Sequence, residues 1–245
     1  MFWGQETDDS SSSIPILLRY NMKITAFSDG HGMFPKFKED GDILLIAGDI
    51  LPVWNHNLTF QKHWYEESFI PWLDSLPFKH KVFCCGNHDL YFYHSSLKEI
   101  RKNLPSNCYY LQDDSVTLDG IKIYGTPWQL PFCDWAFNLC EEDLAIKFKK
   151  IPNDIDILLS HGPAYGYADI VLHKTYYCSD GNLGSKALLD AVRRTNPKFV
   201  ISGHIHTANH ELISGCFNNK ITEFANVSYI DEKYEPYYDP LVFNI

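Results

Sequence analysis

Five short polar clusters in this sequence carry side chains that could bind a metal ion or transfer a proton. They are Ser28-Asp29-Gly30-His31-Gly32, Ala47-Gly48-Asp49, Gly86-Asn87-His88-Asp89, Ser160-His161-Gly162-Pro163 and Ser202-Gly203-His204-Ile205-His206. One such cluster alone would fit a surface turn, because turns also favour Gly, Asn and Asp. All five, however, directly follow runs that predict strands. This recurrence favours a functional site over five unrelated turns.

The donor atoms in these clusters are carboxylate oxygens, an amide oxygen and imidazole nitrogens. The candidate ligands are Asp29, His31, Asp49, Asn87, His88, His161, His204 and His206. A mixed set of this kind suits manganese, iron or zinc better than magnesium or calcium, which prefer all-oxygen shells. Eight side chains are too many for one four-coordinate ion. Two ions about 3.5–4 Å apart, bridged by one carboxylate, would use them.

The elements that position these clusters alternate between strands and helices in the first half of the chain. We predict buried strands at 23–28, 42–47, 81–85, 155–160 and 198–202, and helices at about 55–76, 95–104, 137–149 and 184–195. Pro71 lies inside the first of these helices and predicts a kink or a break there. Ligands of open α/β sheets bind beyond the carboxyl ends of the strands, so we expect the five clusters to converge.

The remaining β-rich segments complete the expected architecture. Short runs at 108–111, 115–118 and 121–124 predict a hairpin or meander, and 221–227 predicts a further strand. The expected fold class is α/β, a layered α-β-β-α sandwich of two packed mixed sheets flanked by helices. Residues 1–21 are polar and Ser-rich and are expected to form a tail, with an edge strand at 14–18 as the alternative. Residues 22–245 are expected to form one domain.

Composition excludes some classes of partner. The chain has 21 basic and 31 acidic residues and a formal net charge of -10. Nucleic acid and anionic membranes demand a basic surface, so neither is expected as a stable partner. The seven cysteines are odd in number and show no CxxC spacing, which predicts reduced, buried thiols in a cytoplasmic protein. No apolar run approaches the roughly 18 residues of a membrane span, and the oligomeric state is left open.

The order of the clusters resembles the calcineurin-like metallophosphoesterase superfamily, with Asp-x-His, Gly-Asp, Gly-Asn-His-Asp, His and Gly-His-x-His between residues 23 and about 230. A closer similarity is to the metallophosphoesterase-domain-containing proteins of animals and their bacterial relatives. It rests on SLPFKHK at 75–81, LDGIKIYGTPW at 118–128, His161-Gly162-Pro163, and the Gly184-Ser185 helix start leading into Gly203-His204-Ile205-His206. The resemblance makes 22–245 a metallophosphoesterase domain and implies a metal-dependent phosphoric ester hydrolase.

The resemblance also assigns roles to the site residues. The metal ligands fall into two sets joined by a bridge: Asp29, His31 and His206 hold one ion, Asn87, His161 and His204 hold a second, and Asp49 bridges the two. His88 is left as proton carrier or donor to a phosphate oxygen, with Asp89 behind it to orient the ring. The two ions are divalent transition metals, Mn²⁺ first, with Fe or Zn as alternatives. A hydroxide that bridges them attacks the phosphorus.

The expected substrate follows from charge. The segments 27–34, 47–54, 83–94, 125–135, 160–172 and 202–213 contain no Lys or Arg. A monoester dianion is usually met by Arg or Lys, whereas a diester carries one negative charge. We therefore expect a phosphodiesterase for a small phosphodiester or nucleotide, cyclic nucleotides included. A phosphomonoesterase and a non-catalytic binding scaffold are the alternatives, and a distant base such as Lys174 would weaken the charge argument.

Two further observations bear on the substrate. Gly48-Asp49 is not followed by the Asp-Arg-Gly of protein Ser/Thr phosphatases, which argues against a phosphoprotein. Aromatic residues near the clusters could stack on a nucleobase, with Trp128 as the first choice and Tyr165 as the second. The aromatic runs 91–93 and 128–135 could equally belong to the core.

Several reactive residues are assigned structural roles instead. The histidines outside the clusters are predicted to lie at the surface or to cap helices: His56, His63, His80, His94, His173 and His210. Cys84 and Cys85, although next to the central cluster, are expected to pack inside the strand.

Overall fold

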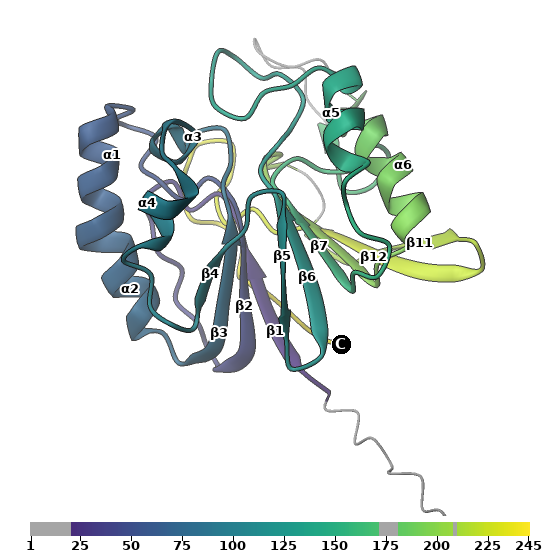
Figure 1. Cartoon of the computed structure of the whole chain (residues 1–245), viewed down its shortest axis with the longest axis horizontal. Helices are drawn as coiled ribbons and strands as arrows, with labels where there is room; N and C mark the ends of the chain where they lie inside the picture. Colours follow the sequence, from purple (N-terminus) through teal and green to yellow (C-terminus); the bar gives the residue numbers. More distant parts are fainter. Residues whose placement is uncertain (1–20, 172–180, 208–209) are drawn as a thin grey trace, which may run out of the picture.

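Two β-sheets pack face to face, and helices cover the outer face of each sheet (Figure 1). The computed structural model describes residues 21–171, 181–207 and 210–245. Within them the layers follow the order helix, sheet, sheet, helix, which confirms the predicted α-β-β-α sandwich. The run 14–18, expected as a tail or an edge strand, lies outside the described residues, as does Lys174.

The first sheet has the strand order β13-β1-β2-β3-β4. Its strands are β1 (Lys23–Phe27), β2 (Gly41–Ala47), β3 (Phe78–Cys84), β4 (Cys108–Tyr110) and β13 (Leu241–Asn244). The first four are parallel, so their carboxyl ends meet at one edge of the sheet. β13 pairs antiparallel with β1 and was not predicted, because it is a short edge strand in which only Phe243 is buried.

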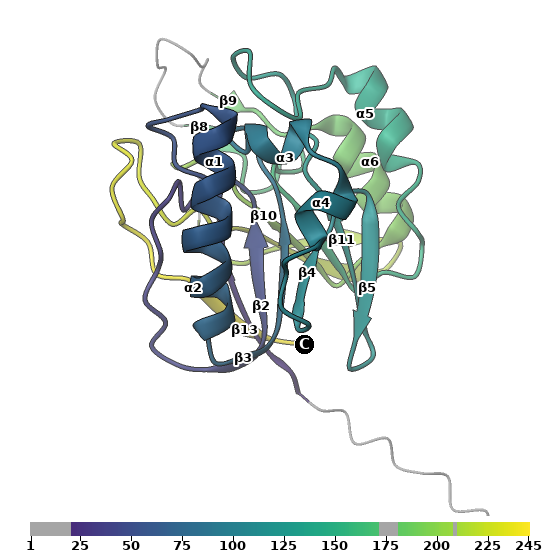
Figure 2. The same cartoon turned by 60° about the vertical axis from the view of Figure 1, so that its left-hand side comes forward.

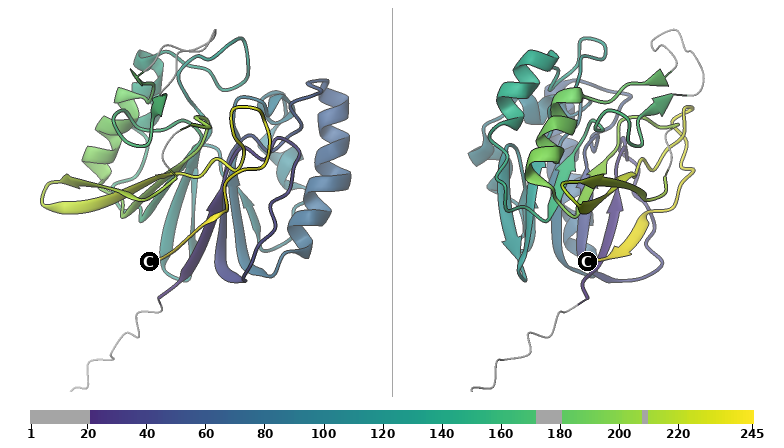
Figure 3. Two further views of the ribbon diagram at one scale, coloured as in Figure 1. Left: turned by 180° about the vertical axis from the view of Figure 1, so that it is seen from behind. Right: turned by 90° about the vertical axis from the view of Figure 1, so that its right-hand side faces the viewer.

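The second sheet has the order β11-β12-β10-β7-β6-β5. Its strands are β5 (Asp114–Leu118), β6 (Ile121–Thr126), β7 (Ile157–Ser160), β10 (Phe199–Ser202), β11 (Ile213–Phe217) and β12 (Lys220–Asn226). The four central strands are parallel, and an antiparallel hairpin closes each edge. Figure 3 shows the two sheets from behind and from the side. A separate two-stranded ladder joins β8 (Ile170–Val171) to β9 (Gly181–Asn182).

Side-chain alternation along the strands explains the layering. In β2, Ile43 and Leu45 enter the core between the sheets, whereas Leu44 and Ile46 enter the core beneath the first helical layer. Successive side chains of a strand point to opposite faces, so a run that is apolar at every position must be covered on both sides. The continuous apolar sequence of this strand therefore specifies a central place in a sandwich.

The helices over the first sheet begin with one continuous segment (Figure 2). It consists of α1 (Leu58–Trp64), a π-helical turn (Tyr65–Phe69) and α2 (Ile70–Ser75). The N–H of Ile70 donates to the carbonyl oxygen of Tyr65, five residues back, and Pro71 follows in the first turn of α2. The wider turn accommodates the proline, which lacks an N–H, so the helix continues where a break was one expectation.

Shorter helices complete the two outer layers. They are α3 (Leu90–His94) and α4 (Leu97–Arg101) on the first sheet, and α5 (Glu141–Phe148) and α6 (Lys186–Thr195) on the second. α5 begins four residues after its predicted start, because Phe137 has a φ of 54°, which a right-handed helix does not accept. Ser185 caps α6 by accepting the N–H of Leu188 at 3.1 Å. No helix in the described ranges is long and apolar enough to cross a membrane.

Candidate metal centre

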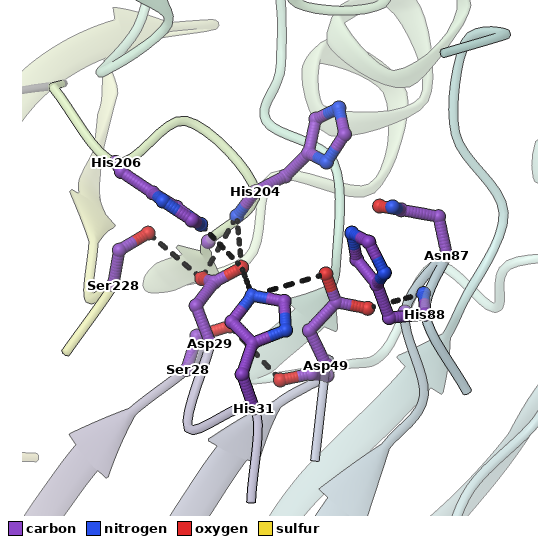
Figure 4. Close-up of polar contacts among 12 residues, drawn as sticks. Ser28, Asp29, His31, Asp49, Asn87, His88, His204, His206 and Ser228 are labelled. Carbon is purple, nitrogen blue, oxygen red and sulfur yellow. Dashed lines mark hydrogen bonds and ion pairs between the residues drawn. The ribbon is translucent and has the colours of Figure 1, made fainter. Parts of the chain in front are cut away.

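The polar clusters converge at the carboxyl ends of the strands, where both sheets contribute side chains to one site (Figure 4). The first sheet supplies Asp29, His31, Asp49, Asn87 and His88, and the second supplies His161, His204 and His206. The predicted convergence is therefore confirmed. Each functional residue leaves its strand at a tight turn, and the geometry of those turns determines where its side chain points.

Three of these turns hold non-glycine residues in the left-handed region, and the turn after β1 holds two of them. The φ angles are 55° at Asp29, 46° at His31, 50° at Asp49 and 71° at His204. Such strain persists only where the surrounding structure imposes it, and it gathers at functional sites. Packing is equally tight at Gly86, where a Cβ atom would overlap the Asp49 carboxylate and the His161 ring.

Asp29 is fully buried and is surrounded by donors. It accepts the backbone N–H of His204 at 3.0 Å and the hydroxyl of Ser228 at 2.8 Å. Its Oδ1 lies 3.4 Å from Nε2 of His206. Burial alone would raise the pKa of Asp29, but the hydrogen bond and charge of His206 outweigh burial and hold that pKa well below its usual range. Ligand atoms of Asp29, His31 and His206 lie within 4.8 Å of one another, so the first predicted set is assembled.

Asp49 lies between the two predicted sets of ligands. Its Oδ2 is 3.6 Å from Nε2 of His31 and 3.3 Å from Nε2 of His161. Its Oδ1 accepts the backbone N–H of His88 at 2.7 Å. One carboxylate thus faces a member of each set, which is the position that a bridging ligand requires.

The second set is only partly assembled. Nε2 of His161 is 3.0 Å from Oδ1 of Asn87, while its Nδ1 donates to the carbonyl oxygen of Ala47 at 2.8 Å. The His204 ring, in contrast, points away from the two carboxylates (Figure 4). Its centre lies 5.1 Å from the His161 ring and 5.6 Å from the Phe132 ring. His204 must turn about its side-chain bonds before it can join Asn87 and His161.

His31 provides the test of whether a metal ion fits these residues. Both ring nitrogens of His31 are buried and lack a hydrogen-bond partner in the described residues. Burial lowers the pKa of His31 to about 3, so the ring is neutral at physiological pH. A buried polar atom without a partner is costly, and Nε2 of His31 faces the carboxylates of both Asp29 and Asp49. A transition-metal ion would satisfy this nitrogen, so the residues fit a metal centre.

His161 and His206 differ from His31 because they are paired with carboxylates. Burial opposes their charged forms, but Asp49 outweighs burial at His161 and raises its pKa to about 9. Asp29 likewise raises the pKa of His206. Nδ1 of His206 donates to the carbonyl oxygen of Asp231 at 3.1 Å, so its Nε2 is directed at Asp29. Carbonyl partners of this kind fix which nitrogen faces a metal ion.

The predicted pairing of Asp89 with the His88 ring is wrong. The Asp89 carboxylate accepts the backbone N–H groups of Ile50 at 3.0 Å, Leu51 at 2.8 Å and Gly86 at 2.8 Å. Asp89 therefore joins the turn after β2 to the turn after β3. Carboxylates satisfy clustered backbone donors well, and that use leaves Asp89 unavailable to the His88 ring.

The side chain within hydrogen-bond distance of the His88 ring is instead that of His56. Nε2 of His56 lies 3.0 Å from Nδ1 of His88, and the Trp135 ring packs on His88 with a centroid distance of 3.9 Å. Gln61 holds the backbone of His88 by donating to its carbonyl oxygen at 2.9 Å. His56 was predicted to lie at the surface or to cap a helix, and no short motif in the sequence distinguishes it from the other isolated histidines.

Trp128 and Tyr165, the predicted stacking residues, both have other partners. The indole N–H of Trp128 donates to Asp113 at 2.8 Å, and Nζ of Lys147 lies 3.9 Å from the centre of a Trp128 ring. Trp128 also lines a small hollow together with His204. Tyr165 lies beside Lys186, whose Nζ is 5.1 Å from its ring centre. The aromatic residues with the metal-site histidines as ring neighbours are instead Phe132, Trp135 and Tyr234.

The cysteine prediction is only partly confirmed. Cys84 and Cys85 are buried in and after β3, and burial raises the pKa of both thiols well above the ordinary value. Cys108 is also buried, whereas Cys133, Cys140 and Cys216 are free and exposed. The expectation of buried thiols is wrong for these three, because Cys133 and Cys140 lie in or beside a surface loop and Cys216 lies in the edge strand β11.

Comparison with known proteins agrees with this arrangement. A sequence model described as calcineurin-like phosphoesterase matches residues 22–208. Human metallophosphoesterase domain-containing protein 1 is 32% identical over 228 residues, which cover 84% of this chain and 65% of the human protein. This chain therefore spans slightly less than two thirds of that relative.

Two other similarities complete the comparison. A UPF0046 protein of Caenorhabditis elegans is 32% identical over 230 residues, which cover 88% of this chain and 76% of that protein. The solved structure of the Thermus thermophilus protein TT1561 superposes with a TM-score of 0.56 at 14% identity, over 91% of this chain and 99% of the other. The family match covers more than half of the chain and includes all five polar clusters. The chain belongs to the calcineurin-like phosphoesterase family.

Proposed function

We propose that this protein is a dinuclear metal-dependent phosphodiesterase that hydrolyses a small phosphodiester, with nucleotide diesters, cyclic ones included, as the preferred class. The observation that carries the proposal is the position of Asp49 between His31 and His161, at 3.6 Å and 3.3 Å. Three buried side chains in this arrangement suit two metal ions that share one carboxylate. When bound, two divalent ions would supply positive charge for the phosphate and a water of lowered pKa as nucleophile.

The residues of the chain have separate roles in this proposal. Asp29, His31 and His206 hold the first ion, and Asp49 is shared between the two. Asn87, His161 and His204 hold the second ion, after the His204 ring has turned. The mixed oxygen and nitrogen donors favour Mn²⁺, with Fe or Zn as alternatives.

His88 is proposed to act on the substrate rather than on a metal. Burial lowers its pKa to about 4, so the ring is neutral at pH 7 and can donate an N–H to a phosphate oxygen or to the leaving alcohol. His56 and Trp135 both contact the ring. Asp89 affects the site indirectly, because its hydrogen bonds join two of the turns that carry the site residues.

Charge supports a diester over a monoester. The ion-pair partners of Asp29 and Asp49 in the described residues are histidines alone, without lysine or arginine. The nearby Lys147 is already paired with Asp113 at 3.0 Å. A substrate with one negative charge needs less cationic help than a dianion. Trp128 remains the proposed nucleobase platform, through its place in the hollow that His204 also lines, and Tyr165 remains the second candidate.

The cellular location and the size class of the substrate are also part of the proposal. We propose a cytoplasmic location, because the six cysteines in the described residues are free thiols, and a reducing compartment maintains that state. The net charge of -10 supports a small-molecule substrate over a nucleic-acid polymer.

The bridging role of Asp49 predicts that metal content and activity fall together. Asp49→Ala should lose at least one of the two ions after gel filtration and lose phosphodiesterase activity in parallel, as measured by elemental analysis and turnover of bis-p-nitrophenyl phosphate. Asp169→Ala is the control, because Asp169 is buried but bonds the backbone of Gly166 and Gly184. Two tightly held ions in Asp49→Ala would contradict the bridge.

Metal binding should release protons at pH 7. Asp49 raises the pKa of His161 to about 9, so its Nε2 carries a proton that an ion must displace. The apparent metal affinity should therefore rise with pH up to about 9, about tenfold per pH unit for this proton. Calorimetry in buffers of different ionisation enthalpy measures the release. His161→Gln should release about one proton fewer, and an unchanged count would exclude His161 as a ligand.

His88 and His56 should affect turnover without affecting metal content. His88→Ala should keep both ions and lose about 10²- to 10⁴-fold in rate, most strongly for substrates with a poor leaving alcohol. His56→Ala removes one hydrogen bond to the His88 ring and should lose about two- to tenfold. His63→Ala, on the exposed side of α1, is the matched control. If His88→Ala loses its metal ions, the ligand assignment is wrong.

A substrate panel tests the proposed function directly. The metal-loaded protein should have a higher kcat/KM for bis-p-nitrophenyl phosphate than for p-nitrophenyl phosphate, and a higher value for a 2′,3′-cyclic nucleotide than for its monophosphate product. Faster turnover of the monoesters would support the phosphomonoesterase alternative. Binding of phosphate esters without turnover of any of them would support the scaffold.

A further inference from the structure

Tyr234 lies against the metal site but belongs to none of the five sequence clusters. Its ring centre is 5.2 Å from that of His31 and 5.3 Å from that of His206, both of which are assigned to the first metal ion. The residue comes from the segment between β12 and β13, on the C-terminal side of every motif. About 38% of Tyr234 is exposed, so part of the side chain is accessible to solvent.

The backbone holds Tyr234 in a conformation that a tyrosine rarely adopts. Its φ is 61°, and bulky residues with a positive φ usually mark a turn, strain or a functional constraint. The turn is fixed by Asp231, whose side chain accepts the N–H groups of Lys233 at 2.8 Å and Glu235 at 3.0 Å. Glycine or asparagine would fit such a turn with less strain, yet the sequence places a large ring there.

The turn is linked directly to a metal ligand. The carbonyl oxygen of Asp231 accepts the Tyr234 N–H at 3.0 Å and Nδ1 of His206 at 3.1 Å. One oxygen therefore sets both the direction of His206 and the position of Tyr234. This coupling places the phenol at a fixed position relative to the first ligand set.

The Tyr234 hydroxyl is a donor without a partner. It has no hydrogen bond to any other described residue. Burial raises the pKa of Tyr234 to about 12, and the charges of Asp49 and Asp29 add to the shift. The ring that carries the hydroxyl lies against His31 and His206, two members of the first ligand set. The hydroxyl stays protonated, and so able to donate, at any physiological pH.

We propose that Tyr234 is a substrate-binding residue whose hydroxyl donates a hydrogen bond to a non-bridging oxygen of the bound phosphate. The inference rests on the proposed function, which places a phosphate between the two ligand sets. A neutral donor suits a site whose carboxylates have only histidines as ion-pair partners in the described residues. Together with His88, it gives the phosphate two donors that carry no charge.

The test compares Tyr234→Phe with Tyr237→Phe. Tyr237 lies in the same segment, is 72% exposed and packs on Tyr238. Each protein is loaded with Mn²⁺, its metal content is measured, and inorganic phosphate is titrated by calorimetry. Tyr234→Phe should keep both ions and bind phosphate about ten- to hundredfold more weakly, because a hydrogen bond to a charged group is lost. Tyr237→Phe should match the wild type.

Turnover of bis-p-nitrophenyl phosphate is measured in the same samples. If the wild type binds phosphate but hydrolyses no ester, the proposed function is refuted. The Tyr234 inference is then decided by the phosphate affinities of wild type and Tyr234→Phe alone. Equal phosphate affinity in Tyr234→Phe and wild type would overturn the inference, as would a wild type that does not bind phosphate. Loss of metal from Tyr234→Phe would show that the ring supports His31 and His206 instead, which also overturns it.

Discussion

The site depends on the burial of two carboxylates, Asp29 and Asp49, in a region where their ion-pair partners in the described residues are histidines alone. A buried charge is costly unless it is paired and hydrogen-bonded. The chain meets this requirement with the neighbouring imidazoles of His161 and His206, backbone N–H groups and the Ser228 hydroxyl. Most of the remaining features of the site follow from that requirement. The left-handed turn at His204 brings a backbone donor to Asp29, and Gly86 lets the chain approach Asp49 and His161 closely.

The same requirement explains why the histidines are not equivalent. His161 and His206 pair with a carboxylate and have raised pKa values, whereas burial leaves His31 and His204 neutral, with a pKa of about 3. Backbone carbonyl oxygens of Ala47 and Asp231 fix the rings of His161 and His206. The site thus combines imidazoles that are already neutral with imidazoles that must first lose a proton before they can bind an ion.

The sequence predicted the layered fold and the convergence of the clusters because both depend on patterns that repeat. Apolar runs such as β2 are buried on both faces, and each polar cluster follows a strand. Features that depend on a single long-range contact were missed. His56 lies 32 positions before His88, and Ser228 lies 199 positions after Asp29, so no local spacing joins either pair. Asp89 was misassigned because adjacency in sequence suggested a contact that the turn geometry does not allow.

The two sheets contact each other through different kinds of side chain in the core and at the site. In the core, apolar side chains such as Ile24 and Ile157 pack between the sheets. At the site, polar contacts cross between the sheets, from Ser228 to Asp29 and from His161 to the Ala47 carbonyl oxygen. Each ligand set combines residues from both sheets, so bound metal ions would link the two sheets at this end. When no metal ions are bound, the two sheets should separate locally at this polar end first. The apolar core between the sheets should keep the rest of the sandwich together.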